Sequence, residues 1–229
     1  GVLAGGSIHF KSQKQCKKCT SSGCDDCSNT GREIVDLLSL TERQIRELRG
    51  ERIAMIFQDP GKALNPGLTI RSQVAEVFQE HRESDVFERA GIADTMSGLT
   101  SYLLKQYVRQ ETNFITKLLL KFPPFSLARK KVDKAINGLV SEALAETQIP
   151  NANKIMERFP HELSGGMKQR VMIAQAIACN PDLLIADEPT TALDVTVQAR
   201  VLDLIKDLQK RHKTSVLYIS HDLSLVRRV

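Results

Sequence analysis

Short apolar runs alternate with amphipathic segments along the chain, and this alternation predicts an α/β fold. Residues 6–10 alternate between polar and apolar side chains as in a strand, and apolar segments of strand length lie at residues 52–57, 183–186 and 215–219. Residues 196–212 carry apolar side chains at helical spacing, as expected of a crossover helix that packs on a parallel sheet. The apolar residues of that helix are Val197, Val201, Leu204, Ile205 and Leu208. The sequence therefore predicts a parallel sheet with helical crossovers.

A long helical block interrupts this alternation. From Thr69 to about Ile149 the pattern is helical, and Gly91, Gly98 and the Pro123-Pro124 pair mark breaks between helices. A further helix is expected at residues 41–48, with Thr41 as its N-cap. We interpret the block as an insertion into an α/β core. The expected divisions are a partial core at 1–68 with a Cys-rich insert at 11–30, a helical subdomain at 69–160, and the remainder of the core at 161–229.

Composition supports a folded protein that does not cross a membrane. The chain has 229 residues, of which 41% are hydrophobic and 26% charged, as in folded globular domains. Its apolar runs are far shorter than the roughly 18 residues that a membrane-spanning helix needs. The net charge of +5 is compatible with nucleic acid, acidic lipid headgroups or a nucleotide, so the charge alone decides little.

Four of the five cysteines lie close together, at Cys16, Cys19, Cys24 and Cys27. Two Cys-x-x-Cys pairs supply the four thiolates of a tetrahedral zinc site or an iron–sulfur cluster. Their separation is shorter than in a zinc ribbon, and free thiols or reversible disulfides are the alternative. A local cluster of this kind favours a reducing compartment. The fifth cysteine, Cys179, is expected to be a small buried apolar residue.

The clearest chemistry follows the strand at residues 183–186, which leads into Asp187 and Glu188. Ligands bind at the carboxyl edge of a parallel sheet. There, an Asp is suited to hold a magnesium ion on nucleotide phosphates, and the next carboxylate to orient an attacking water. An acidic turn without function is the alternative for this motif taken alone.

A second motif, Ser164-Gly165-Gly166, precedes a helix expected at 168–178. A serine cap, two glycines and the exposed N–H groups of a helix terminus make a site for phosphate, although alone they indicate only a helix cap. Three more residues occur in a fixed order around these motifs. Taken singly, Gln58 is a loop amide, Asp194 a helix cap and His221 one of five histidines.

Together these motifs resemble the ATP-binding cassette (ABC) ATPases. The matching segments are the Q-loop at Gln58, the signature at 163–167, Walker B at 183–188, the D-loop at 191–194 and the switch histidine at His221. The resemblance is closer to one branch, the first of the paired ATPases of dipeptide, oligopeptide and nickel importers. The stretches similar to that branch are 53–60, 63–66, 160–167 and 178–196.

The resemblance implies a P-loop NTPase-like (RecA-like) core with an inserted helical subdomain, which binds ATP and Mg²⁺ between two subunits. Asp187 and Gln58 would hold Mg²⁺, Glu188 would polarise the hydrolytic water, and His221 would contact the γ-phosphate. Ser164, Gly165 and Gly166 would face the nucleotide of the opposite subunit, with Asp194 close to the dimer interface.

The implied partners are a second ABC ATPase subunit, in a homologous heterodimer, two transmembrane permease subunits and, indirectly, an extracytoplasmic substrate-binding protein. The implied location is the cytoplasmic face of the membrane, and the implied work is import of peptides or nickel complexes. No nucleic acid is expected, because no stripe of aromatic and basic residues suited to stacking on bases is evident. The alternatives are a DNA-repair type of ABC ATPase with a zinc element and a non-catalytic binding module.

Two features depart from the family. The sequence contains no Gly-x-x-x-x-Gly-Lys-Ser/Thr loop, so we expect a truncated core, a fragment unable to hydrolyse ATP alone. The 105 positions between Gln58 and Leu163 are also more than expected, with unfamiliar material around residues 92–127. This material is interpreted either as an extra helical hairpin or as a contact with permease subunits or the lipid surface.

Overall fold

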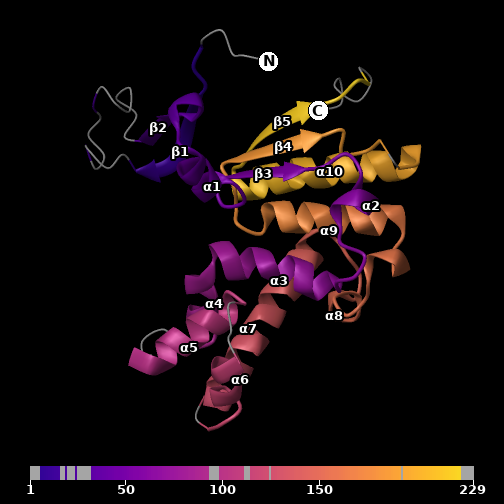
Figure 1. The fold of residues 1–229 in the computed structure, drawn as a ribbon. Coiled ribbons are helices and arrows are strands. Elements are labelled where there is room, and N and C mark those ends of the chain that lie inside the picture. The colour runs from indigo at the N-terminus through magenta and orange to yellow at the C-terminus, as the bar shows by residue number, and fades with distance from the viewer. Residues whose placement is uncertain are drawn as a thin grey trace.

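A parallel sheet with two long helices on one face, and a separate block of helices, make up the computed structural model (Figure 1). The structure describes residues 6–15, 19, 24, 32–92, 98–110, 114–123, 125–191 and 193–222. Among the described helices, none combines the length and hydropathy that crossing a bilayer requires.

The sheet contains three described strands in the order β3-β4-β5, which are Ile53–Ile56, Leu183–Asp187 and Ser215–Ile219. Both pairs are parallel, with Ile56 opposite Ala186 and Asp187 opposite Ile219. The carboxyl ends of all three strands therefore lie at one edge. Residues that follow these strands meet there although they are far apart in the sequence.

One face of the sheet is covered by α9 (Gly165–Ile177) and α10 (Val195–His212). Side chains alternate between the faces of a strand, so Ala54 and Ile56 of β3 point to the helices together with Leu184 of β4. The helices contribute the rest of this core, which is Met172, Ile173, Ala176, Ile177, Val201, Leu204, Ile205 and Leu208. The expected crossover helix is confirmed in position and in the face it buries.

The helical block has its own core. Its helices are α3 (Ile70–His81), α4 (Glu83–Arg89), α5 (Gly98–Val108), α6 (Phe114–Leu119), α7 (Phe125–Glu146) and α8 (Ala152–Ile155). Two backbone hydrogen bonds join its beginning to its end, from Ile70 N to Arg158 O (2.8 Å) and from Arg71 N to Met156 O (2.7 Å). The chain thus enters and leaves the block at neighbouring points, as an insertion requires.

An antiparallel pair precedes the sheet, formed by β1 (His9–Gln15) and β2 (Arg32–Asp36). The first strand begins later than the sequence pattern indicates and occupies residues 11–15, which were assigned to the Cys-rich insert. The bounds of β1 are set by its antiparallel pairing with β2, which extends from His9 to Gln15. The sequence periodicity did not reveal β2. Helix α1 (Glu42–Leu48) begins at Thr41, whose capping box confirms the expected N-cap.

The amino ends of the strands are tied together by backbone and side-chain contacts. The carbonyl of Arg52 accepts hydrogen bonds from the N–H groups of Asp182 (2.9 Å) and Leu183 (3.1 Å), and Ser215 N donates to Asp182 O (2.8 Å). The side chains of Arg52 and Asp182 form an ion pair and are only 15% and 5% exposed. This pair therefore closes the end of the sheet opposite to the candidate site.

Candidate functional site

Glu188 lies at the centre of the candidate site, directly after β4. Its backbone has φ of 44°, a left-handed conformation that non-glycine residues rarely adopt and that recurs at active sites. Its N–H donates to Ile219 O at 2.9 Å. The turn after β4 is thereby fixed against the end of β5, and this bond supports the unusual backbone.

Three side chains contact the Glu188 carboxylate, one from the same loop and two from the loops after β3 and β5. Gln58 Nε2 donates to Oε2 at 2.6 Å, and Thr191 Oγ1 donates to the same oxygen at 2.9 Å. His221 Nδ1 lies 2.6 Å from Oε1. Both carboxylate oxygens are therefore engaged, and the structure brings together three of the residues expected at the site: Gln58, Glu188 and His221.

These contacts shift the proton affinities of the pair. The pKa of His221 is raised, first by its hydrogen bond to Glu188 and then by the negative charge of that carboxylate. The pKa of Glu188 is lowered, first by the hydrogen bond with His221 and then by the one from Thr191. Glu188 is therefore ionised at neutral pH. An ionised, solvent-accessible carboxylate at a sheet edge is suited to polarise a water molecule.

Asp187, the last residue of β4, is half-buried and, within the described part of the chain, makes no hydrogen bond or ion pair through its side chain. Its carboxylate oxygens are therefore available to bind a metal ion. A carboxylate beside an amide carbonyl and water suits Mg²⁺, a hard cation that prefers oxygen ligands and retains several waters. Asp187 and Gln58 have the right chemistry for the magnesium that the family resemblance implies.

The signature residues form a second group, where α9 and α10 begin. Ser164 caps α9 through its Oγ, which accepts from Met167 N at 3.4 Å. Asp194 caps α10 by accepting from Val197 N at 3.0 Å. A side-chain carbon on Gly166 would lie 3.0 Å from Val197 Cγ1, so this position admits only glycine without movement. The two helix starts therefore pack against each other.

Within the described residues, no hydrogen bond joins this second group to the Glu188 cluster, so the expected site residues occur as two groups on one chain. Two residues with structural roles here were not singled out from the sequence. Thr191 holds Glu188, and Gln198 Nε2 donates to Thr190 O and Leu193 O, both at 3.1 Å. Gln198 thereby stabilises the loop between the Glu188 cluster and the signature residues. Nothing in the sequence pattern distinguishes Gln198 from other polar positions of α10.

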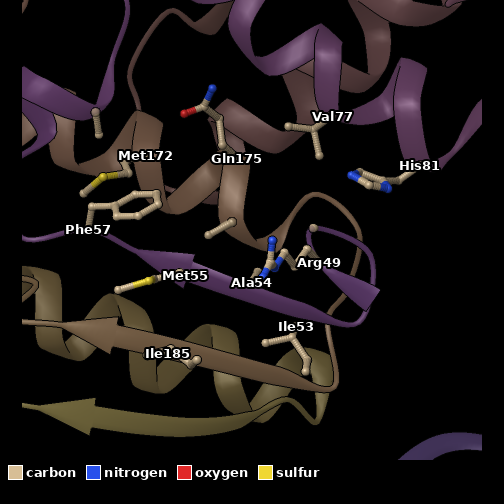
Figure 2. Close-up of a pocket in the computed structure, with 13 residues that line it drawn as sticks. Arg49, Ile53, Ala54, Met55, Phe57, Val77, His81, Met172, Gln175 and Ile185 are labelled. Carbon is tan, nitrogen blue, oxygen red and sulfur yellow. The ribbon is translucent and has the colours of Figure 1, made fainter. Parts of the chain in front are cut away.

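A pocket of about 490 Å³ lies beside β3, on the side where the helical block meets the sheet. Figure 2 shows Val77 and His81 of α3 and Met172 and Gln175 of α9 on one side of it, with Met55 and Phe57 along the strand. The lining is mostly apolar. Because Phe57 immediately precedes Gln58, the pocket adjoins the loop that reaches the Glu188 cluster.

The cysteine cluster falls largely outside the described residues. Cys16 and Cys27 are not described, and Cys19 and Cys24 are half-buried. Elsewhere in the described chain, no three His, Cys, Asp or Glu side chains gather into a metal site. Cys179 is partly buried, and burial raises the pKa of its thiol to about 12. This thiol is therefore protonated and unreactive at neutral pH.

A parallel sheet with carboxylates at its carboxyl edge, together with a serine-capped helix that begins with two glycines, is typical of a nucleotide-binding α/β fold. Residues 24–191 match the family model described as ABC transporter, and the chain belongs to this family. The expected family and the P-loop NTPase fold are thus confirmed. The division into subdomains and the roles of the individual site residues remain predictions.

Known relatives are ATP-binding proteins of peptide transporters. The chain is 37% identical over 244 residues to a probable peptide ABC transporter ATP-binding protein, y4tR of Sinorhizobium fredii, covering 98% of this chain and 59% of that protein. It is 40% identical over 194 residues to the oligopeptide transport ATP-binding protein OppD of Bacillus subtilis, covering 85% of this chain and 41% of that protein. The chain thus spans about half the length of these relatives.

Solved structures support the same fold. The dimeric post-hydrolysis ABC cassette MJ0796, bound to ADP and phosphate, superposes with a TM-score of 0.50 at 22% identity. The match covers 86% of this chain and 65% of that chain. At this level of identity the likeness establishes the fold and nothing about substrate.

Proposed function

We propose that the protein is the ATP-binding and hydrolysing subunit of an ABC importer for peptides, acting at the cytoplasmic face of the membrane. The observation that carries the proposal is the Glu188 carboxylate, held by Gln58, Thr191 and His221 at the carboxyl edge of the sheet. The names of the relatives, which are peptide and oligopeptide transport proteins, favour peptide cargo over nickel complexes and over the DNA-repair alternative.

Each residue of the cluster has a role in the proposed reaction. Glu188 accepts a hydrogen bond from the hydrolytic water and polarises it toward the γ-phosphate, while Thr191 and Gln58 fix the carboxylate. His221 is placed to contact the γ-phosphate. Bound Mg²⁺, held by Asp187 and Gln58, would neutralise charge on the phosphates. Because phosphoryl transfer depends mainly on positioning and electrostatics, this geometry accounts for the part that these residues take in the reaction.

The second group of residues acts on the other nucleotide of a dimer. Ser164, Gly165 and Gly166 present the start of α9 to a nucleotide bound by a partner ATPase subunit, and Asp194 lies at the dimer interface. Their separation from the Glu188 cluster within the described chain supports this division. The loop at Gln58, with the adjoining pocket, is the contact for two permease subunits, which receive cargo from an extracytoplasmic substrate-binding protein.

The 229 residues contain no phosphate-binding loop, so we propose that they do not hydrolyse ATP unaided. The test uses a form of the protein in which a Gly-x-x-x-x-Gly-Lys-Ser/Thr loop precedes these residues. In that form Glu188→Gln should retain ATP binding and lower turnover by at least about 100-fold. The matched control is Glu47→Gln, on the exposed surface of α1, and it should leave turnover unchanged. Unimpaired turnover by the Glu188 variant, or steady turnover by the 229 residues alone, would contradict the proposal.

From the spacing of the four cysteines we also propose a structural zinc or iron–sulfur site at Cys16, Cys19, Cys24 and Cys27. Metal analysis of anaerobically purified protein should find about one equivalent of zinc, or the iron of one cluster, per chain. The Cys19→Ser and Cys24→Ser double variant should lose it, whereas Cys179→Ser should retain it. Less than about 0.2 equivalents of zinc plus iron in the unaltered protein would argue against the site.

A further inference from the structure

The positive charge of the protein is concentrated in one part of the helical block. Residues 105–134 contain eight Lys and Arg against two Asp and Glu, a local charge of +6 that exceeds the +5 of the whole chain. This stretch overlaps the unfamiliar material around residues 92–127. The rest of the protein is therefore close to neutral, and the excess needs its own explanation.

Large apolar side chains are exposed in the same stretch. Phe114, Leu118, Phe122 and Leu127 are between 46% and 81% exposed, and they are four of the eleven exposed large hydrophobic residues in the described chain. Phe114, Leu118 and Phe122 are spaced four residues apart, so α6 and the turn after it present them on one side. An exposed apolar group of this kind is typical of an interaction surface.

The segment that carries these residues is firmly attached to the helical block. Leu120 is 1% exposed and belongs to the core, against which Leu119 and Phe125 also pack. Backbone hydrogen bonds run through the turn, from Lys121 N to Leu118 O (3.1 Å) and from Ser126 N to Phe122 O (3.0 Å). The apolar side chains are therefore held outward by a packed support.

The cations of this stretch have little compensation. Lys121 lies between the exposed Leu118 and Phe122, and Lys130, Lys131 and Lys134 are exposed on α7. The described acid of this stretch, Asp133, is engaged internally: it accepts a hydrogen bond from Tyr107 Oη (2.7 Å) and lies 3.9 Å from Arg129 Nε. Within the described residues these four lysines form no ion pair, so the surface is complementary to negative charge.

We propose that this surface, termed the α6 tip and formed by Phe114, Leu118, Lys121, Phe122 and Leu127, binds the surface of an anionic lipid membrane. Aromatic and aliphatic side chains would enter the boundary between headgroups and acyl chains, and the lysines would remain at the anionic headgroups. Figure 1 shows α6 at the end of the helical block that lies farthest from the sheet.

The combination of exposed apolar side chains and lysines favours a lipid surface over an acidic protein partner. A protein interface typically has a rim that offers hydrogen-bond donors and acceptors, whereas the α6 tip has four hydrocarbon side chains and a lysine, which is a donor only. The proposal goes beyond ATP hydrolysis, because it requires neither nucleotide nor the Glu188 cluster. It would give the protein a second attachment to the membrane besides permease subunits.

Vesicle co-sedimentation of the full chain without nucleotide tests the proposal. Vesicles of phosphatidylcholine are compared with vesicles that also contain about 30% phosphatidylglycerol, whose negative headgroups attract basic segments. Binding to the anionic vesicles should be at least about ten-fold tighter, because each lysine near the surface contributes about five-fold. High salt should weaken it, because salt screens the attraction.

Three variants separate the contributions. Phe114→Ala with Phe122→Ala should weaken binding at least about ten-fold through lost apolar insertion, and Lys121→Glu should weaken it about as much through reversed charge. The matched control is Leu38→Ala with Leu68→Ala, which removes two exposed apolar side chains outside the α6 tip and should leave binding unchanged. Circular dichroism confirms that each variant is folded.

Absence of binding to anionic vesicles, equal binding to neutral ones, or equal loss in the control variant would overturn the proposal. Capture of purified permease subunits through the α6 tip without vesicle binding would overturn it as well, in favour of a protein partner. None of these outcomes bears on the role of Glu188, which is tested by turnover.

Discussion

The ion pair between Arg52 and Asp182 offers the sharpest test of what holds the site in place. It joins the residue before β3 to the residue before β4, where their side chains are only 15% and 5% exposed. Removing one member of a buried pair leaves the other charge without compensation and costs about 3–5 kcal/mol. The register of β3 on β4, and hence the meeting of Gln58 with Glu188, depends on this end of the sheet.

The size of the expected loss of stability depends on which of the two charges remains without its partner. Asp182→Ala leaves the more exposed Arg52 guanidinium, so we expect a loss near the lower limit, about 3 kcal/mol. Arg52→Ala leaves the nearly inaccessible carboxylate and should cost more, about 4 kcal/mol. At about 2–4 °C per kcal/mol for a chain of this size, Asp182→Ala should lower the melting temperature by roughly 6–12 °C.

The assay is a double-variant cycle measured by chemical and thermal unfolding. The double variant with Ala at both positions leaves no unpaired charge, so its loss of stability should be smaller than the sum of the two single losses by at least about 2 kcal/mol. Single losses below about 1 kcal/mol, or strict additivity, would show that the pair does not secure the sheet. The exposed pair of Arg49 and Glu42 is a control, which should contribute less than about 1 kcal/mol.

Two further predictions concern the site and its support. The pKa of His221 is raised in the folded protein, so its contact with Glu188 stabilises the fold below the unfolded pKa near 6.5, and this contribution is lost as pH rises through the folded value. The pKa of Glu188 is lowered, so its contribution is present above the unfolded pKa of about 4.5 and is lost as pH falls through the folded value. Their contact is therefore strongest between these values, and in Glu188→Gln an NMR titration should show the His221 pKa falling toward its ordinary value; an unchanged pKa would contradict the contact. Ile173, fully buried between α9 and the sheet, should lose about 2–5 kcal/mol of stability on replacement by Ala. Denaturant unfolding measures this, and a loss below about 1 kcal/mol would mean that α9 is not held by this core.

Local sequence signals were sufficient for elements that are defined by neighbours in the chain. The capping box of Thr41 with Gln44, the serine cap of α9 and the apolar stripe of α10 all follow from residues within a turn or two. The order of the motifs was also enough to identify the family. These features need no tertiary contact to be recognised, because caps and helical periodicity are local.

The sequence was less informative where a partner strand or a buried contact sets the outcome. The extent of β1 depends on its pairing with β2, at the other side of the cysteine segment. For the segment that contains the α6 tip, the sequence indicated only unfamiliar material around residues 92–127, with two alternative interpretations. Which of its residues face solvent was decided by Leu120 entering the core and Phe114 and Phe122 remaining outside.

The candidate site itself shows the same limit. From the sequence, Gln58, Glu188 and His221 were three residues in a suggestive order, and their roles rested on resemblance. Only the parallel register of β3, β4 and β5 brings Gln58, 130 positions away, and His221, 33 positions away, to the carboxylate of Glu188. The sequence thus determined which chemical groups are available, and the tertiary structure decided which of them meet, because long-range pairing of strands converts distant positions into neighbours.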